Sequence, residues 1–159
     1  MSEEKHDNVI APPPIIWIVL IALGYLLGLW KPLPFVPATD FFFWLGIVIW
    51  FFGFVLAVLA FLQFRNAGTD VRPNTETSAI VDTGVYAFSR NPIYLGGVIG
   101  IAGFAIALNN FWILLMIVPY ILIISYGVIN REEAYLEKRF GETYLDYKKR
   151  VRRLSLIHI

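Results

Sequence analysis

The chain contains no cysteine and few histidines. Its 159 residues include no Cys and only two His. Without cysteine there are no disulfides, no thiolate nucleophiles and no cysteine-ligated metals. The two histidines, His6 and His158, lie near the two ends of the sequence, where we expect them to be solvated rather than catalytic. We therefore expect no metal site.

Charge is scarce along much of the chain. Hydrophobic residues make up 58% of the sequence and aromatic residues 16%, which is too apolar for a soluble domain that must cover its own surface with polar groups. Four uncharged runs are long enough to cross or nearly cross a bilayer; they cover residues 11–30, 41–64, 92–108 and 111–129. Only Asn109 and Asn110 separate the last two runs, which predicts a tight antiparallel hairpin.

The predicted fold class is thus all-α. We expect one membrane-embedded domain covering residues 1–159, a polytopic helix bundle with about four transmembrane helices. A cytoplasmic loop, residues 65–91, should connect the second and third spans. C-terminal amphipathic helices, residues 130–153, should follow the fourth span on the same side.

The basic residues predict the orientation of this bundle. Of the 13 Lys and Arg residues, only Lys31 lies between the first two runs, and the other twelve fall on the opposite side of the bilayer. Cytoplasmic loops carry such an excess of positive charge. We therefore expect an integral, multi-pass membrane protein with both termini cytoplasmic and with membrane lipids as partners. The net charge of +1 gives no reason to expect nucleic acid.

Within the four runs, small residues recur at helical spacing. Gly24 and Gly28 lie in the first run, and Gly96, Gly100 and Gly103 lie in the third. Such stripes allow helix backbones to approach closely in lipid, so packing is the preferred interpretation. The runs contain no charged residue, which argues against a proton or ion pathway across the membrane. Chemistry is therefore expected at the cytoplasmic interface.

One polar segment there has the sequence TSAIVDTGVYAFSRNPIYLGG. Pro92 suits the first turn of the third helix, so Arg90 and Asn91 should lie at a helix N-terminus, where backbone N–H groups favour an anion. The alternative is a snorkelling arginine beside an N-capping asparagine, a common pair at membrane boundaries.

The second segment, REEAYLEKRFGETYLDYKKRVRR, follows the fourth run. Its apolar and aromatic residues fall three or four positions apart, which predicts an amphipathic helix on the cytoplasmic face, bent or interrupted at Gly141. Its basic end, residues 148–153, is explained by attraction to anionic headgroups. Glu132 and Glu133 are not explained in this way, because negative charge is disfavoured at the end of a membrane helix. We expect Arg131, Arg90 or a bound cation to compensate them.

Together the two segments resemble the isoprenylcysteine carboxyl methyltransferase and phospholipid methyltransferase family of membrane enzymes, in its bacterial form. The resemblance rests on GVYAFSRNPIYLGG and EEAYLEKRFGETYLDYKKRV and covers about Phe64 to Arg153. It implies that S-adenosyl-L-methionine is the cofactor and methyl donor. It also implies a catalytic group formed by Arg90, Asn91 and Tyr94. The implied cofactor-binding residues are Tyr86, Pro92, Gly96, Glu132, Glu133, Leu136, Phe140, Tyr144, Tyr147 and Arg150.

The sequence departs from the family pattern at two places. Many members have histidine where this chain has Asn91, and an asparagine side chain cannot accept a proton at neutral pH, so it is not a general base. The chain also ends in LSLIHI, where members often have tryptophan and proline, which leaves the packing of residues 154–159 open.

The residue types present suit the cofactor. Arginine can bind its carboxylate, carboxylates can bind its ammonium or ribose, and aromatic faces suit adenine and the sulfonium. The sequence has no GxGxxG at a strand-to-helix turn and no strand pattern, so the site is not of the Rossmann type. The acceptor should be amphiphilic, with its reactive head near Arg90 and its apolar tail between the third and fourth helices or in lipid. The absence of a base favours carboxyl O-methylation of an isoprenylcysteine type.

Three other interpretations remain open. The first is N-methylation of a phospholipid or another small lipid. The second is a membrane reductase with a nicotinamide cofactor, because sterol-reductase-like proteins have a loosely similar C-terminal pattern. The third is a non-catalytic four-helix membrane protein that binds lipid or a partner helix. The oligomeric state is not predicted.

Overall fold

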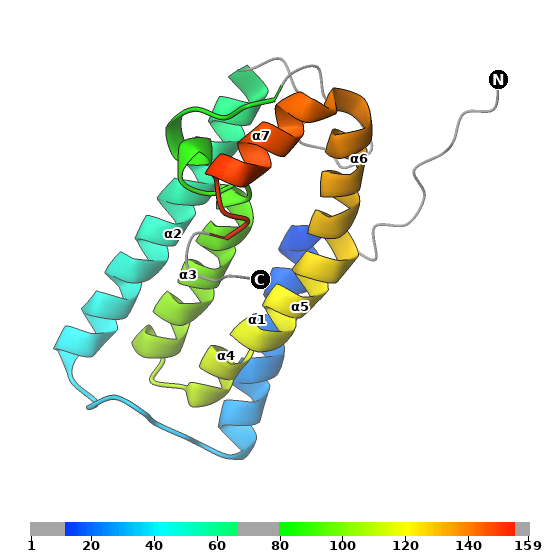
Figure 1. The fold of residues 1–159 in the computed structure, drawn as a ribbon. Coiled ribbons are helices and arrows are strands. Elements are labelled where there is room, and N and C mark those ends of the chain that lie inside the picture. Colours follow the sequence, from blue (N-terminus) through cyan, green and yellow to red (C-terminus); the bar gives the residue numbers. More distant parts are fainter. Residues whose placement is uncertain (1–11, 67–79, 155–159) are drawn as a thin grey trace.

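The computed structural model describes residues 12–66 and 80–154, which form a bundle of antiparallel helices with one helix lying across an end (Figure 1). The first two helices are α1 (Pro13–Trp30) and α2 (Asp40–Asn66). The short 3₁₀ turn η1 (Gly84–Ala87) precedes α3 (Pro92–Ala107). A long helical run then contains α4 (Phe111–Leu115), α5 (Ile117–Ile124), the π-helical turn η2 (Ser125–Ile129) and α6 (Asn130–Phe140), and α7 (Glu142–Arg150) follows it.

The predicted all-α membrane bundle is confirmed. Three helical segments are long and apolar enough to cross a bilayer: α1 with 18 residues, α2 with 27 and the run from Phe111 to Phe140 with 30. The apolar helix α3 has 16 residues, a length of about 24 Å at 1.5 Å per residue, compared with a hydrocarbon core of roughly 30 Å. It lies alongside α2 (Figure 1). The count of four spans stays a prediction.

Glycines hold α3 close to α2. A Cβ atom built on Gly53 would lie 2.6 Å from the carbonyl oxygen of Gly96, and one built on Gly103 would lie 2.4 Å from the backbone nitrogen of Trp50. On the other side of the bundle, a Cβ atom on Gly24 would lie 2.8 Å from the Cα atom of Ile113. Real Cβ atoms do not come this close, so the helix backbones touch where the glycines lie. The packing interpretation of the glycine stripes is confirmed.

The hairpin between the third and fourth runs is also confirmed. Asn109 has a φ of 47° and makes the turn, which asparagine tolerates better than most residues. Asn110 accepts a hydrogen bond from the backbone N–H of Trp112 at 3.0 Å and thereby caps α4. This turn and the connection between α1 and α2 lie at one end of the bundle, and η1, α6 and α7 lie at the other (Figure 1).

Gly141 separates the C-terminal segment into two helices. It has a φ of 54° and stands between α6 and α7, so α7 turns back across the end of the bundle (Figure 1). The expected apolar stripe survives this turn: Tyr144, Tyr147 and Val151 are buried together, and Leu136 and Phe140 pack against them. The stripe therefore joins α6 to α7 in addition to covering the bundle.

The expectation that Glu132 and Glu133 stand at the end of a membrane helix is wrong. The π-helical turn η2 leads directly into α6, so the helix continues through Phe140 and the two acids lie in the first turn of α6. The unfavourable interaction with a helix C-terminus is therefore absent. Their partners come from tertiary structure instead.

Candidate functional site

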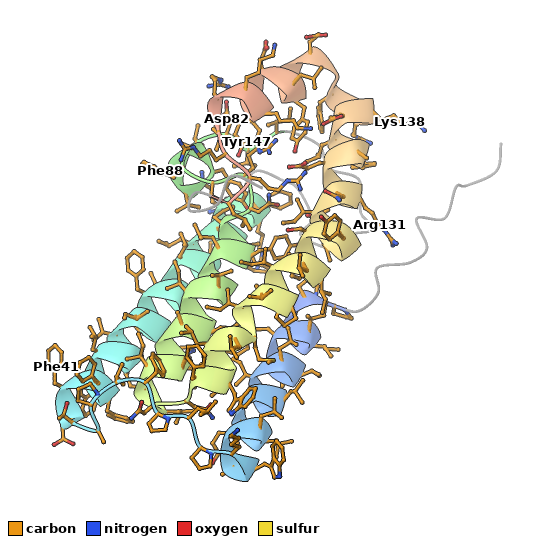
Figure 2. The ribbon with its side chains drawn as sticks, turned by 60° about the horizontal axis from the view of Figure 1, so that its bottom comes forward. Phe41, Asp82, Phe88, Arg131, Lys138 and Tyr147 are labelled. Carbon is orange, nitrogen blue, oxygen red and sulfur yellow. The ribbon has the colours of Figure 1, made fainter. Side chains whose placement is uncertain are left out.

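The predicted site residues gather at one end of the bundle. They come from η1, from the residues just before α3 and its first turns, from α6 and from α7. Figure 2 shows this end, with Asp82 and Tyr147 where α7 crosses the bundle. Gln63 near the end of α2 fixes η1, because its side chain donates to the carbonyl of Thr83 at 2.7 Å and accepts from the N–H of Val85 at 3.2 Å. The connection before α3 is therefore anchored to α2.

Glu133 is the centre of the site. It is buried, with 4% of its surface exposed. One carboxylate oxygen lies 3.1 Å from Nη2 of Arg90 and also accepts a hydrogen bond from Nε of Arg153 at 3.2 Å. The other oxygen accepts from Nη2 of Arg153. Residues 90, 133 and 153 of the chain thus form one buried ionic cluster, and both oxygens of Glu133 are used within it.

The guanidinium group of Arg90 has hydrogen-bond donors that this cluster does not use. Its side chain is only 8% exposed. Within residues 12–66 and 80–154, its Nε and Nη1 groups are buried without a hydrogen-bond partner. Burying such donors unpaired costs free energy, and native structures seldom leave them so. The arrangement suits an anionic group bound at Arg90.

Tyr144 and Tyr147 lie close enough to this arginine to sense its charge. Burial raises the pKa of both phenols, and the positive charge of Arg90 acts in the opposite direction on each. Tyr147 donates a hydrogen bond to the carbonyl of Tyr86 at 2.8 Å, and its ring meets that of Tyr144 edge to face at 6.1 Å between centroids. The two rings thus form an aromatic wall beside a buried cation.

Glu132 has a different partner from its neighbour. Its Oε1 accepts a hydrogen bond from the hydroxyl of Tyr94 in α3 at 3.1 Å. Burial raises the pKa of Glu132, the hydrogen bond from Tyr94 lowers it, and the negative charge of Glu133 raises it further, with a net increase. The result is a partly buried carboxyl group next to the ionic cluster, bound by one hydroxyl.

Asn91 precedes α3, as expected, and Pro92 begins the helix. The side chain of Asn91 makes no capping hydrogen bond; its Nδ2 instead donates to the backbone carbonyl of Arg153 at 3.2 Å. The hydroxyl of Ser89 donates to the same carbonyl at 3.2 Å. The N-cap explanation of Asn91 therefore fails, because the carbonyl of Arg153 competes for its side chain.

The other predicted residues lie around this centre. Tyr86 is buried and donates to the carbonyl of Ala60 at 3.3 Å. Leu136 and Phe140 belong to the apolar cluster under α7. Arg150 is exposed and donates to Asp82 at 3.1 Å. Gly96 lies against α2 at Gly53, and this packing accounts for a glycine there without any ligand.

Sequence reasoning missed the role of Arg153. Its run of basic residues was explained by lipid headgroups, yet Arg153 is half-buried on Glu133, and Lys148 forms an ion pair with Glu137. The expected partners of the acids were Arg131, Arg90 or a cation. Arg131 is exposed and points away from the bundle (Figure 2). The sequence offered one signal that Arg153 contacts the bundle: the apolar Leu154, which is buried, follows it directly.

Fold and site together define a class: an integral membrane helix bundle with a buried polar cluster at one end. The model of the phospholipid methyltransferase family matches residues 41–143, more than half of the chain. The chain belongs to this family. The resemblance proposed from the two polar segments is confirmed.

Two curated relatives extend this comparison. A protein-S-isoprenylcysteine O-methyltransferase of Schizosaccharomyces pombe is 36% identical over 72 residues, which cover 45% of this chain and 30% of that enzyme. The chain thus spans less than a third of the length of this relative. An uncharacterized protein of Haemophilus influenzae is 38% identical over 61 residues, which cover 38% of this chain and 97% of that protein. No solved structure matches the chain.

Proposed function

We propose that this protein transfers a methyl group from S-adenosyl-L-methionine to a lipophilic acceptor at the cytoplasmic membrane interface. The observation that carries the proposal is the contact between the two sequence segments of the family resemblance: Arg90 of the first forms a buried ion pair with Glu133 of the second. Family membership makes methyl transfer the expected chemistry.

The residues at this end of the bundle fit the proposed cofactor. The unpartnered donors of Arg90 suit its carboxylate. Glu132, which contacts only one hydroxyl in the described part of the chain, suits its ammonium or ribose. The rings of Tyr144 and Tyr147 suit its adenine or sulfonium. S-adenosyl-L-methionine would supply a methyl group open to in-line displacement.

The protein's own contribution would be positioning and shelter from water. Asn91 is unsuited to accept a proton, and its side chain is already bound to the carbonyl of Arg153. The hydroxyl of Tyr94 donates a hydrogen bond to Glu132. A carboxylate acceptor needs no base, so these residues favour carboxyl O-methylation. The name of the relative from Schizosaccharomyces pombe agrees with this preference.

N-methylation of a phospholipid is the second candidate, favoured by the description of the matching family. Glu132 is the group that could accept a proton from an amine, because burial raises its pKa. Assays with a prenylated cysteine and with a phosphatidylethanolamine separate the two acceptors.

The acceptor is expected to keep its apolar tail in the membrane. Leu154 packs against Leu95 of α3 and Ile121 of α5 and so covers the seam between these helices next to the site. We propose that the tail approaches from the lipid along this seam, on the membrane side of Leu154. No apolar tail then needs to leave the bilayer.

Cofactor binding tests the proposal. The detergent-purified protein should bind S-adenosyl-L-methionine in a calorimetric titration and should not bind a reduced nicotinamide dinucleotide. Binding of the nicotinamide compound alone would favour the reductase alternative. Binding of neither would favour the non-catalytic lipid-binding alternative.

A further inference from the structure

Arg153 and Arg90 share Glu133 unequally. Arg153 places Nε on one carboxylate oxygen and Nη2 on the other, the two-pronged arrangement that guanidinium groups favour. Arg90 contacts Oε1 alone, through Nη2 at 3.1 Å. Glu133 therefore contacts two guanidinium nitrogens of Arg153 and only one of Arg90.

The cluster formed by Arg90, Arg153 and Glu133 has one positive charge in excess. Without Arg153, the carboxylate of Glu133 would neutralise Arg90 and would have a free oxygen to attract its second prong. Glu132 does not compensate the excess at this point, because consecutive helix residues face different directions and its hydrogen bond goes to Tyr94. The charge of the cluster thus depends on Arg153.

The backbone fixes Arg153 in this position. The backbone N–H of Arg90 donates to the carbonyl of Arg152 at 2.9 Å. Ser89 and Asn91 both donate to the carbonyl of Arg153. Leu154 is buried immediately afterwards. The segment 151–154 is therefore attached to the residues just before α3, and the side chain of Arg153 is held against Glu133.

We propose that Arg153 is a positioning residue for the methyl donor. By neutralising Glu133 and occupying both of its oxygens, it leaves unpartnered donors of Arg90 to bind the carboxylate of S-adenosyl-L-methionine. This inference rests on the proposed function. It adds a residue that lies beyond the range 41–143 matched by the family model.

Two ligands and two variants test it. The ligands are S-adenosyl-L-methionine and its decarboxylated analogue, which has the same sulfonium and adenosine but no carboxylate. The wild type should bind the first more tightly. Arg153→Gln should weaken binding of S-adenosyl-L-methionine by about tenfold or more, as for a weakened charged hydrogen bond, and should change binding of the analogue by less than about twofold.

The second variant, Glu133→Gln with Arg153→Gln, separates electrostatics from structure. Because no carboxylate is left to neutralise Arg90, this double variant should regain the preference for the ligand that carries a carboxylate. Arg152→Gln is the matched control, since the side chain of Arg152 is exposed, and it should bind both ligands like the wild type. Thermal unfolding in detergent reports whether each variant folds.

Three results would overturn the proposal. They are equal weakening of both ligands in Arg153→Gln, unchanged binding of both, and a double variant without the preference. If Arg153→Gln does not fold, the double variant alone decides. A wild type that fails to bind S-adenosyl-L-methionine would overturn the proposed function and this inference together, whereas failure in the variants alone leaves the proposed function intact.

Discussion

Glu132 and Glu133 are neighbours in sequence, but their side chains have different hydrogen-bond and ion-pair partners. Glu133 has two arginine partners and both oxygens occupied. Glu132 has one hydroxyl partner, and its pKa is raised by burial. A buried ion pair and a buried, weakly compensated carboxyl group respond differently to removal of the charge. We therefore propose that Glu133 holds Arg90 and that Glu132 contacts the cofactor.

Glu132 makes stability depend on pH. Its folded-state pKa is raised above the ordinary value near 4.5, so the folded protein keeps a proton that the unfolded chain has already lost. Stability from this group is complete below that value and falls as pH rises through the raised pKa. Glu132→Gln lacks this loss, so its unfolding temperature in detergent should exceed that of the wild type increasingly as pH rises above about 4.5. A constant difference across this range would contradict the assignment.

A substitution at Arg90 tests whether its guanidinium group binds the cofactor carboxylate. Arg90→Lys keeps the positive charge and can keep the ion pair with Glu133, but an ammonium cannot reproduce the planar fork. We expect the affinity for S-adenosyl-L-methionine to fall by about 1 to 3 kcal/mol, the range for a charged hydrogen bond, with little change in unfolding temperature. Calorimetric titration measures the first quantity. Affinity equal to that of the wild type would mean that Arg90 acts only as a point charge.

At the scale of single residues, the sequence predicted which residues lie in the site better than it predicted which residues they contact. It located Arg90, Asn91 and Glu133 in two separate polar segments, because polar residues next to apolar runs stand out. It did not predict that the carbonyl of Arg153 would take the side chain of Asn91. That contact depends on the path of residues 151–154 back to α3, which no local pattern encodes.

At the scale of elements, the packing of α3 against α2 determines where the site lies. Gly53 faces Gly96, and Gly46 faces Gly103 and Ala107. The pairs are spaced seven residues apart in each helix, so the two backbones meet twice along one contact line. This contact sets the position of Pro92 and therefore of Arg90 relative to α6.

A larger residue in this contact line should disrupt it. Gly53→Leu would place a Cβ atom 2.6 Å from the carbonyl of Gly96. We expect it to destabilise the protein by about 1 to 3 kcal/mol, as overpacking does, and to reduce cofactor binding. The control is Val48→Leu on the same helix, where the side chain is 63% exposed. Equal unfolding temperatures for the two variants would show that the contact is dispensable.

The sequence predicted the elements well where a local residue pattern determines them. The hairpin at Asn109 followed from the two polar residues that separate the apolar runs, and the interruption at Gly141 followed from the low helix propensity of glycine. The stripe of Tyr144, Tyr147 and Val151 followed from helical spacing. The π-helical turn η2 was not predicted, because it keeps the apolar pattern of its neighbours and changes only the hydrogen bonding. The acids were expected at a helix end because the uncharged run stops at residue 129.

At the scale of the whole molecule, the proposed function predicts that the site faces the compartment that supplies the cofactor. The distribution of basic residues predicts that η1, α6 and α7 lie in the cytoplasm and that the connection between α1 and α2 lies on the opposite side. Because the chain has no cysteine, single cysteines can report this orientation directly. Thr39→Cys and Thr143→Cys are suitable, since both positions are exposed at opposite ends of the bundle.

A membrane-impermeant maleimide should label Thr39→Cys in intact cells. Thr143→Cys should be labelled only after the membrane is permeabilised, and the cysteine-free chain provides the background. Labelling of both positions from outside, or the reverse pattern, would overturn the orientation. Labelling from opposite sides requires an odd number of membrane spans between residues 39 and 143.

Methyl transfer by the reconstituted protein tests the central claim most directly. The measurement compares transfer from labelled S-adenosyl-L-methionine to a lipid-tailed carboxylate or amine with transfer to the same headgroup lacking its tail, at equal concentration in detergent. The account predicts transfer that depends on Arg90 and strongly prefers the tailed acceptor, because the site lies at the membrane boundary beside the seam of α3 and α5. Equal turnover of the two acceptors, or none with either, would contradict it.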